Sequence, residues 1–290
     1  MARTKAGNRS VSIWALIGIL FITGVFGLVM LLPAAYAEDE VELGNILMKA
    51  HKANQRIPVA SSYNPNLDVK GAYRIQKVYA QQRLSQDQIA GFKGGFCSKA
   101  AQARFGLNAP AAGVLFASGK NTGSPIIEKS AFKTLLIETE IGFMVAKPIT
   151  QPLKDVCELY RYIETVMPAI ELPDAGFAGK ARGVDIIAAN VASAQFIAGK
   201  ETEFRGLDLN NIFVTLTLDG EVVNIGRGTD AMGDQWKAAL WLINTIVKQG
   251  WKIEPGQILI TGALPKAILG KPGKYVADFQ RLGKMSFEVK

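Results

Sequence analysis

Two glutamates separated by one residue are the side chains best placed for chemistry in this sequence of 290 residues. Glu138 and Glu140 lie in an otherwise apolar run, residues 136–143, whose composition favours a β-strand. Alternate residues of a strand share a face, so the two carboxylates would lie together, with their α-carbons about 7 Å apart. Like charges at that spacing repel each other unless solvent or a cation intervenes, and a divalent ion that prefers oxygen ligands would supply the cation.

Glu171 offers a third carboxylate, in a short apolar run at residues 167–172. This run follows directly on a predicted helix, residues 153–166, which Pro168 would end. The three acids together form a candidate set of ligands for a divalent metal ion. An ordinary alternative stays open, namely a solvated strand face plus an unrelated loop carboxylate, because acidic residues are depleted in strands but not excluded from them.

Lys93 is the candidate cation, and it lies among three glycines in residues 91–95, a composition that predicts a turn. Glycine lets a backbone approach a ligand closely, and the ammonium group could then meet an anion. The alternative for this residue is a flexible lysine on the surface.

The composition excludes several classes of site and partner. His51 is the only histidine, so a zinc site built on several imidazoles cannot form, and we expect this residue on the surface of a helix. A Ser-His-Asp or Cys-His site would also need His51. Cys97 and Cys157 allow at most one disulfide. The net charge is +8, but basic residues are scattered among acidic ones, so the sequence does not favour a nucleic-acid partner.

Residues 1–37 differ in kind from the rest and are set aside before the fold is considered. Three basic residues precede an uncharged run, residues 13–32, and Ala35-Tyr36-Ala37 matches a signal peptidase site. We predict a signal peptide cleaved after Ala37 and a periplasmic or otherwise exported protein. The alternative is an uncleaved anchor, because about 20 apolar residues can cross a bilayer. Only then would the membrane be a partner, with the catalytic domain outside the cytoplasm.

The elements that would position the candidate side chains change in character along the chain. Residues 40–84 repeat apolar residues every three to four positions, which predicts two helices. From residue 91 onward, short β-branched or aromatic runs alternate with turn residues, and one further helix is expected at residues 235–249. We therefore expect an N-terminal helical segment, residues 38–90, continuous with a β-rich catalytic domain, residues 91–290.

Six segments, taken in order, resemble the branch of the fumarylacetoacetate hydrolase superfamily that contains 2-keto-4-pentenoate hydratases and 4-oxalocrotonate decarboxylases. The likeness covers most of residues 42–290. The matching segments are residues 91–95 (GFKGG), 137–141 (IETEI), 168–171 (PAIE), 226–228 (GRG), 238–242 (AALWL) and 257–264 (QILITGAL). The resemblance implies an α+β fold, a β-rich roll of mixed sheets with N-terminal helices, that assembles into a homo-oligomer.

By this resemblance, Glu138, Glu140 and Glu171 would hold Mg²⁺ or Mn²⁺. The metal would chelate the carboxylate and the 2-oxo oxygen of a small 2-keto acid and stabilise an enolate by Lewis-acid polarisation. Lys93 matches the family's catalytic lysine, with a role in proton transfer or in holding an anionic group.

Two segments depart from the family pattern. Residues 110–113 read PAAG where the family's hydratases carry an acid, so Ala111 stands in the place of the general acid/base. Residues 189–192 read ANVA in place of Asp-Asn-Ala-Ser, with Ser193 as a substitute if the alignment shifts by one residue. The resemblance also implies substrate contacts from Ser98 and Thr261.

The function implied is a metal-dependent, hydratase-like lyase of aromatic catabolism. It would act on a short 2-keto or 2-hydroxydienoic acid, such as 2-hydroxypenta-2,4-dienoate, through a metal-bound enolate. A decarboxylase of the 4-oxalocrotonate type is the first alternative, because decarboxylation needs no activated water. A non-catalytic exported binder of metal and keto acid is the second, because Ala111 and Ala189 replace acids.

Overall fold

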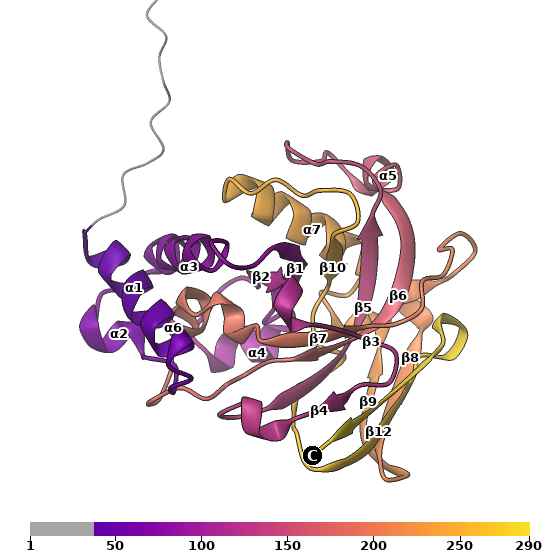
Figure 1. Cartoon of the computed structure of the whole chain (residues 1–290). Helices are drawn as coiled ribbons and strands as arrows, with labels where there is room; N and C mark the ends of the chain where they lie inside the picture. Colours follow the sequence, from indigo (N-terminus) through magenta and orange to yellow (C-terminus); the bar gives the residue numbers. More distant parts are fainter. Residues whose placement is uncertain (1–37) are drawn as a thin grey trace, which may run out of the picture. The chain divides into compact units, whose positions relative to one another are not determined.

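Two β-sheets and a group of N-terminal helices make up the fold in the computed structural model, which describes residues 38–290 (Figure 1). The helices are α1 (Glu38–Lys52), α2 (Ala60–Tyr63), α3 (Val69–Arg83), α4 (Lys99–Arg104), α5 (Val156–Leu159), α6 (Gly183–Ala188) and α7 (Gln235–Lys248). The strands of the eight-stranded sheet are β1 (Ile89–Gly95), β2 (Ala111–Phe116), β3 (Lys120–Thr122), β5 (Leu136–Val145), β6 (Ile163–Leu172), β7 (Gln195–Ala198), β10 (Ile258–Ile260) and β11 (Ile268–Leu269). The strands of the five-stranded sheet are β4 (Ile126–Ile127), β8 (Phe213–Leu218), β9 (Glu221–Arg227), β12 (Gly273–Asp278) and β13 (Lys284–Val289).

The large sheet is mixed, and its strand order brings together segments that are far apart in the chain. The order is β2-β1-β10-β5-β6-β7-β3, and β11 pairs with the start of β5. The pairs β1–β10 and β3–β7 are parallel, whereas the pairs β1–β2, β10–β5, β5–β6 and β6–β7 are antiparallel. The chain leaves the large sheet between β7 and β10, where it forms β8, β9 and α7. The small sheet is completed by β4, which precedes β5, and by β12 and β13, which follow β10 and β11.

The N-terminal helices pack together at one end of the large sheet (Figure 1). Asp68 caps α3 by accepting a hydrogen bond from the Gly71 amide, and the buried face of α3 includes Ala72 and Ile75. Their apolar cluster extends to Ala111 in β2 and to Val191, beyond α6. The helical end of the molecule thus supports the segments that carry Lys93 and its neighbours.

The helix expected at residues 153–166 is wrong, because α5 has a single turn and a strand, β6, follows it. Pro168 lies inside β6, where a missing amide hydrogen usually disfavours a strand. The Pro168 carbonyl accepts from the Gly199 amide, so the missing N–H points to the side of β7, beyond the last β6–β7 pair. A proline is tolerated here because its missing N–H does not face β5, so the β5–β6 ladder loses no hydrogen bond.

The turn expected around Lys93 is also wrong, since residues 89–95 form strand β1 and pair on both sides. The glycines permit close approach of neighbouring backbone. A Cβ on Gly91 would lie 1.9 Å from the Ile258 carbonyl oxygen, and one on Gly94 would lie 3.0 Å from the Thr261 carbonyl oxygen. Glycine-rich composition here reflects crowding between strands and not a reversal of the chain.

Other expected elements are confirmed. Asp234 caps α7 through the Lys237 amide, as its position before an apolar periodic run predicts. β8 and β9 form a hairpin whose turn residues Asp219 and Gly220 have φ of 49° and 90°. The predicted signal peptide, residues 1–37, lies outside the described residues. Within residues 38–290, no helix is long and apolar enough to cross a membrane.

Substitution of Ile75 tests the contribution of the helical end to stability. Ile75 is fully buried in α3, so Ile75→Ala should lower the free energy of unfolding by about 2–5 kcal/mol through lost burial and a residual cavity. Val69 on the same helix is 42% exposed, and Val69→Ala should change the free energy by less than about 0.5 kcal/mol. Chemical denaturation followed by circular dichroism gives both values. Equal losses for the two variants would contradict this account.

Candidate metal centre

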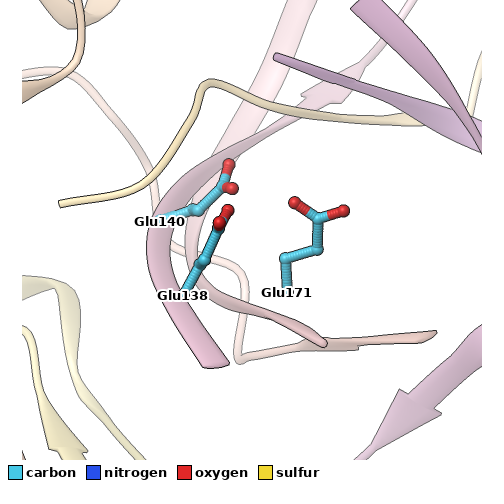
Figure 2. Close-up of side chains that lie close together, drawn as sticks. All are labelled: Glu138, Glu140 and Glu171. Carbon is cyan, nitrogen blue, oxygen red and sulfur yellow. The ribbon is translucent and has the colours of Figure 1, made fainter. Parts of the chain in front are cut away.

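Three glutamates converge at the middle of the large sheet (Figure 2). Glu138 and Glu140 alternate along β5, and the β5–β6 register places Glu171 directly across from Glu138. One carboxylate oxygen from each residue lies within 4.8 Å of the others. Glu140 and Glu171 are fully buried, and Glu138 is partly exposed. Strand periodicity and strand pairing together therefore bring three carboxylates to one face of the sheet.

Several of these carboxylate oxygens lack the partners that burial normally requires. Glu140 Oε2 accepts a hydrogen bond of 2.6 Å from the Gly262 amide. Among the described residues, Glu140 Oε1 and Glu171 Oε1 are buried with no hydrogen-bond partner. A buried carboxylate oxygen without a partner is costly, and hard divalent cations are bound by such oxygens. The donor set therefore fits a divalent metal ion, with Glu138, Glu140 and Glu171 as the residues that would hold it.

Lys93 lies on the same face of the sheet as the glutamates. Lys93 pairs with Ile260 of β10, which pairs with Gly142 of β5, two residues along the strand from Glu140. The Lys93 side chain is buried, and its Nζ lies 2.9 Å from Glu171 Oε2 and donates to the Val191 carbonyl oxygen at 3.1 Å. Two acceptors hold the ammonium group, which leaves one of its three N–H donors for another partner.

Burial and mutual repulsion favour the protonated form of two of the acids. Burial raises the pKa of Glu171 to about 8, against the lowering effect of the Lys93 charge. Burial, followed by the charges of Glu171 and Glu138, raises the pKa of Glu140 well above its usual value. The Lys93 pKa is raised, because the three nearby carboxylates outweigh burial, which by itself would lower it. Protons and a metal ion would thus compete for the same oxygens.

The residues expected to contact substrate have different places in the structure. Thr261 is buried, and its hydroxyl lies 2.6 Å from Gln235 Oε1 and 3.2 Å from the Ile141 carbonyl oxygen. It is adjacent to Gly262, which holds Glu140, so Thr261 lies at the centre with its hydroxyl engaged by the protein. Ser98 caps α4, and its hydroxyl accepts from the Ala101 amide at 3.2 Å.

Ser193 lines a separate cavity of about 320 Å³, between α1, α3 and the segment that follows α6. Its lining includes His51 and Arg83 but none of the three glutamates. His51 lies on the exposed surface of α1, as expected. Its ring packs against Tyr79, and this partial burial, followed by the Arg83 charge, lowers its pKa. The structure therefore does not bring Ser193 together with the candidate metal ligands.

The two positions where acids were expected from the family pattern are apolar. Ala111 pairs with Gly95 in the β1–β2 ladder and packs in a cluster that contains Ile187 and Val191. Ala189 is the C-cap residue of α6 and lines the same cavity as Ser193. Within the described part of the chain, neither position brings a carboxylate to Lys93.

Two groups at the centre could not be found from sequence spacing. The Gly262 amide binds Glu140 across 122 positions of the chain. Gln235 is fully buried, and its Nε2 donates to the Gly228 carbonyl oxygen at 2.6 Å while its Oε1 accepts from the Thr261 hydroxyl. A backbone amide leaves no trace in residue type, and a glutamine at the start of a helix gives no sign of its distant partner.

Comparisons with known proteins identify relatives of this chain. The chain is 30% identical over 243 residues to a 2-keto-4-pentenoate hydratase of Paraburkholderia phymatum, covering 82% of this chain and 93% of the relative. It is 26% identical over 220 residues to a 4-oxalocrotonate decarboxylase of Pseudomonas sp. strain CF600, covering 75% of this chain and 83% of the relative. No family model matches the chain.

A solved structure confirms the expected fold. The 4-oxalocrotonate decarboxylase from Pseudomonas putida G7, complexed with magnesium and adipate, superposes with a TM-score of 0.82. The superposition covers 87% of this chain and 98% of that one, at 24% sequence identity. The α+β architecture with mixed, curled sheets is thus common to both proteins.

The raised pKa of Glu171 predicts how the stability of the metal-free protein depends on pH. Between pH 4.5 and about 8, the folded protein keeps a proton that the unfolded chain releases, so the melting temperature should fall as pH rises through this range. Glu171→Gln cannot lose that proton, and its melting temperature should fall less. Differential scanning fluorimetry of both proteins in chelator checks this. A melting temperature that rises with pH in the wild type relative to Glu171→Gln would be the contrary result.

Proposed function

This chain belongs to the family of 2-keto-4-pentenoate hydratases and 4-oxalocrotonate decarboxylases within the fumarylacetoacetate hydrolase superfamily, and from that premise we propose its reaction and substrate class. The protein is a metal-dependent lyase that acts on a short 2-keto or 2-hydroxydienoic acid, such as 2-hydroxypenta-2,4-dienoate. The observation that carries the proposal is the convergence of three glutamates, with buried and unpartnered oxygens, beside Lys93.

The proposed cofactor is Mg²⁺ or Mn²⁺, held by Glu138, Glu140 and Glu171. Both ions prefer oxygen ligands, and no histidine or thiolate belongs to the set. When bound, the ion would act as a Lewis acid on the 2-oxo oxygen of the substrate and stabilise negative charge there. The Gly262 amide keeps Glu140 in place through its hydrogen bond of 2.6 Å.

Lys93 is the group of this chain proposed to handle charge or protons next to the substrate. Its Nζ is buried and fixed by Glu171 and Val191, so one N–H remains to meet a carboxylate or a reacting carbon of the substrate. Low exposure strengthens its interaction with an anion, because water does not screen the charge. Lys93 can thus orient an anionic keto acid or transfer a proton to it.

A decarboxylase of the 4-oxalocrotonate type is the second candidate, and Ala111 is the observation that favours it. Ala111 is fully buried among apolar side chains, so no carboxylate is available there to activate a water molecule. Hydration needs that step, whereas loss of carbon dioxide does not. A missing acid/base group typically costs about 10²- to 10⁴-fold in rate, so hydration would be slow and decarboxylation would be spared.

An assay on purified residues 38–290 tests the reaction. Ultraviolet absorbance of 2-hydroxypenta-2,4-dienoate and of 4-oxalocrotonate should fall in the presence of Mg²⁺ or Mn²⁺ and stay constant with chelator. Glu138→Ala should lower kcat/KM by at least about 100-fold, the scale of one positioned electrostatic group.

The matched control for this assay is Glu164→Ala, which changes an exposed glutamate of β6 and should leave kcat/KM unchanged. Identification of the product separates hydratase from decarboxylase. The lyase proposal is wrong if neither substrate is consumed by a protein that binds the metal.

The proposed location is the periplasm or another exported compartment, with residues 1–37 as a cleaved signal peptide. The support is the charge pattern and the Ala35-Tyr36-Ala37 segment. Expression of the full chain in a bacterial host should yield a mature protein that begins at Glu38, as determined by N-terminal sequencing of the periplasmic fraction. A membrane-bound product that retains Met1 would instead establish the anchor.

A further inference from the structure

Three consecutive residues that are not glycine adopt the left-handed backbone conformation directly beside Lys93. Asn190, Val191 and Ala192 have φ of 56°, 53° and 57°. This region is unfavourable for residues with a Cβ, and most of all for β-branched valine. Such a run persists only where surrounding contacts impose it, and strained segments of this kind gather at functional sites.

We propose that Asn190 is a positioning residue for catalysis, because it holds this left-handed turn in the conformation that aims the Val191 carbonyl at the Lys93 ammonium group. The expected effect of Asn190 on turnover rests on the lyase function proposed above. Its geometric part concerns Asn190, Val191 and Lys93 alone.

The Asn190 side chain clamps the turn to strand β2. Its Oδ1 accepts from the Val114 amide at 2.7 Å, and its Nδ2 donates to the Val114 carbonyl oxygen at 2.8 Å. β2 is the edge strand of the large sheet, so the carboxamide takes the place that a neighbouring strand would occupy. Gly113 makes room for this contact, since a Cβ there would lie 2.8 Å from the Asn190 carbonyl oxygen.

The clamped turn gives Lys93 an anchor that is independent of the carboxylates. Val191 accepts from Lys93 Nζ at 3.1 Å, while the other partner of the ammonium group, Glu171, belongs to the candidate metal ligands. A Glu171 carboxylate engaged with a metal ion has less negative charge to offer Lys93. The Val191 carbonyl then becomes the constant partner that keeps the ammonium group in place, and its direction depends on the turn that Asn190 holds.

Asn244 provides a matched control in the same chain. Its Oδ1 accepts from the Leu153 amide at 2.7 Å, and its Nδ2 donates to the Leu153 carbonyl oxygen at 2.9 Å. The two asparagines thus make the same pair of hydrogen bonds to one backbone residue. Asn244 joins α7 to the loop before α5. This loop contributes none of the candidate metal ligands. A purely structural role for Asn190 would make the two positions equivalent.

The test compares Asn190→Leu with Asn244→Leu by two independent measurements. The first is steady-state kinetics together with Mn²⁺ binding by calorimetry. Asn190→Leu should lower kcat by about 10²-fold, the scale on which small misplacement of a catalytic group acts, with little change in KM and in the Mn²⁺ dissociation constant. Asn244→Leu should leave kcat unchanged, whatever stability it loses.

The second measurement does not depend on turnover. Proteins labelled with ¹⁵N at the lysine side chain should show a Lys93 ammonium resonance protected from solvent exchange, assigned by its loss in Lys93→Met. This resonance should shift and lose protection in Asn190→Leu and remain unchanged in Asn244→Leu. If the wild type consumes neither substrate, the proposed lyase function fails, and the resonance alone still decides the role of Asn190.

Asn190→Gly is the second variant should Asn190→Leu fail to fold, because glycine accepts a φ of 56° but carries no carboxamide. The same shift of the Lys93 resonance is expected. An unchanged Lys93 resonance in a folded Asn190 variant overturns the proposal. Equal losses of kcat in the Asn190 and Asn244 variants overturn it as well.

Discussion

Burial of three carboxylates beside a single ammonium group is the constraint on which the rest of this structure depends. Ionised carboxylates in an apolar interior are costly unless counter-charges and hydrogen-bond donors accompany them. Lys93 supplies one positive charge and the Gly262 amide supplies one donor, which is too little for three acids. In the metal-free protein, the imbalance is expressed as raised pKa values of Glu140 and Glu171. A divalent cation would neutralise this excess of buried negative charge. The charge imbalance that destabilises the metal-free fold therefore makes the centre suitable for a metal ion.

The mixed sheet makes this concentration of charge possible because the charged residues belong to different strands. The acids come from the adjacent strands β5 and β6, the lysine comes from β1, and β10 lies between β1 and β5. Each group is therefore anchored in a separate, well-paired segment, and repulsion between the acids cannot separate their strands without breaking ladder hydrogen bonds. Two backbone groups complete the centre, the Gly262 amide after β10 and the Val191 carbonyl after α6. The N-terminal helices contribute indirectly, because their apolar cluster extends to Ala111 and Val191.

The chemistry of the centre depends as much on what is apolar as on what is charged. Ala111 and its neighbours are apolar and add no titratable group to the centre. Among the described residues there, the three glutamates are candidate metal ligands and Cys97 is a buried thiol, so Lys93 is the group left to exchange a proton with substrate. Burial raises the pKa of the Cys97 thiol, which removes it as a nucleophile at neutral pH. Reactions that need polarisation of a keto group and one well-placed ammonium group are thus favoured over reactions that need an activated water molecule.

Local patterns were sufficient for the side chains that act within one strand. Glu138 and Glu140 share a face because strand periodicity is a property of neighbouring residues, and their sequence alone therefore indicated a pair of metal ligands. Local patterns were misleading where one composition suits two structures. At residues 153–166 a helix was expected, but a single turn and a strand are found. Around Lys93 the glycines predicted a turn, but they lie in a strand where neighbouring backbone approaches closely. Only the tertiary structure decided that Glu171 faces Glu138, that Gly262 binds Glu140, and that the Val191 carbonyl meets Lys93. Each of these contacts joins segments that are distant in the chain, and strand register and backbone direction, which create them, are set by the packing of the whole fold.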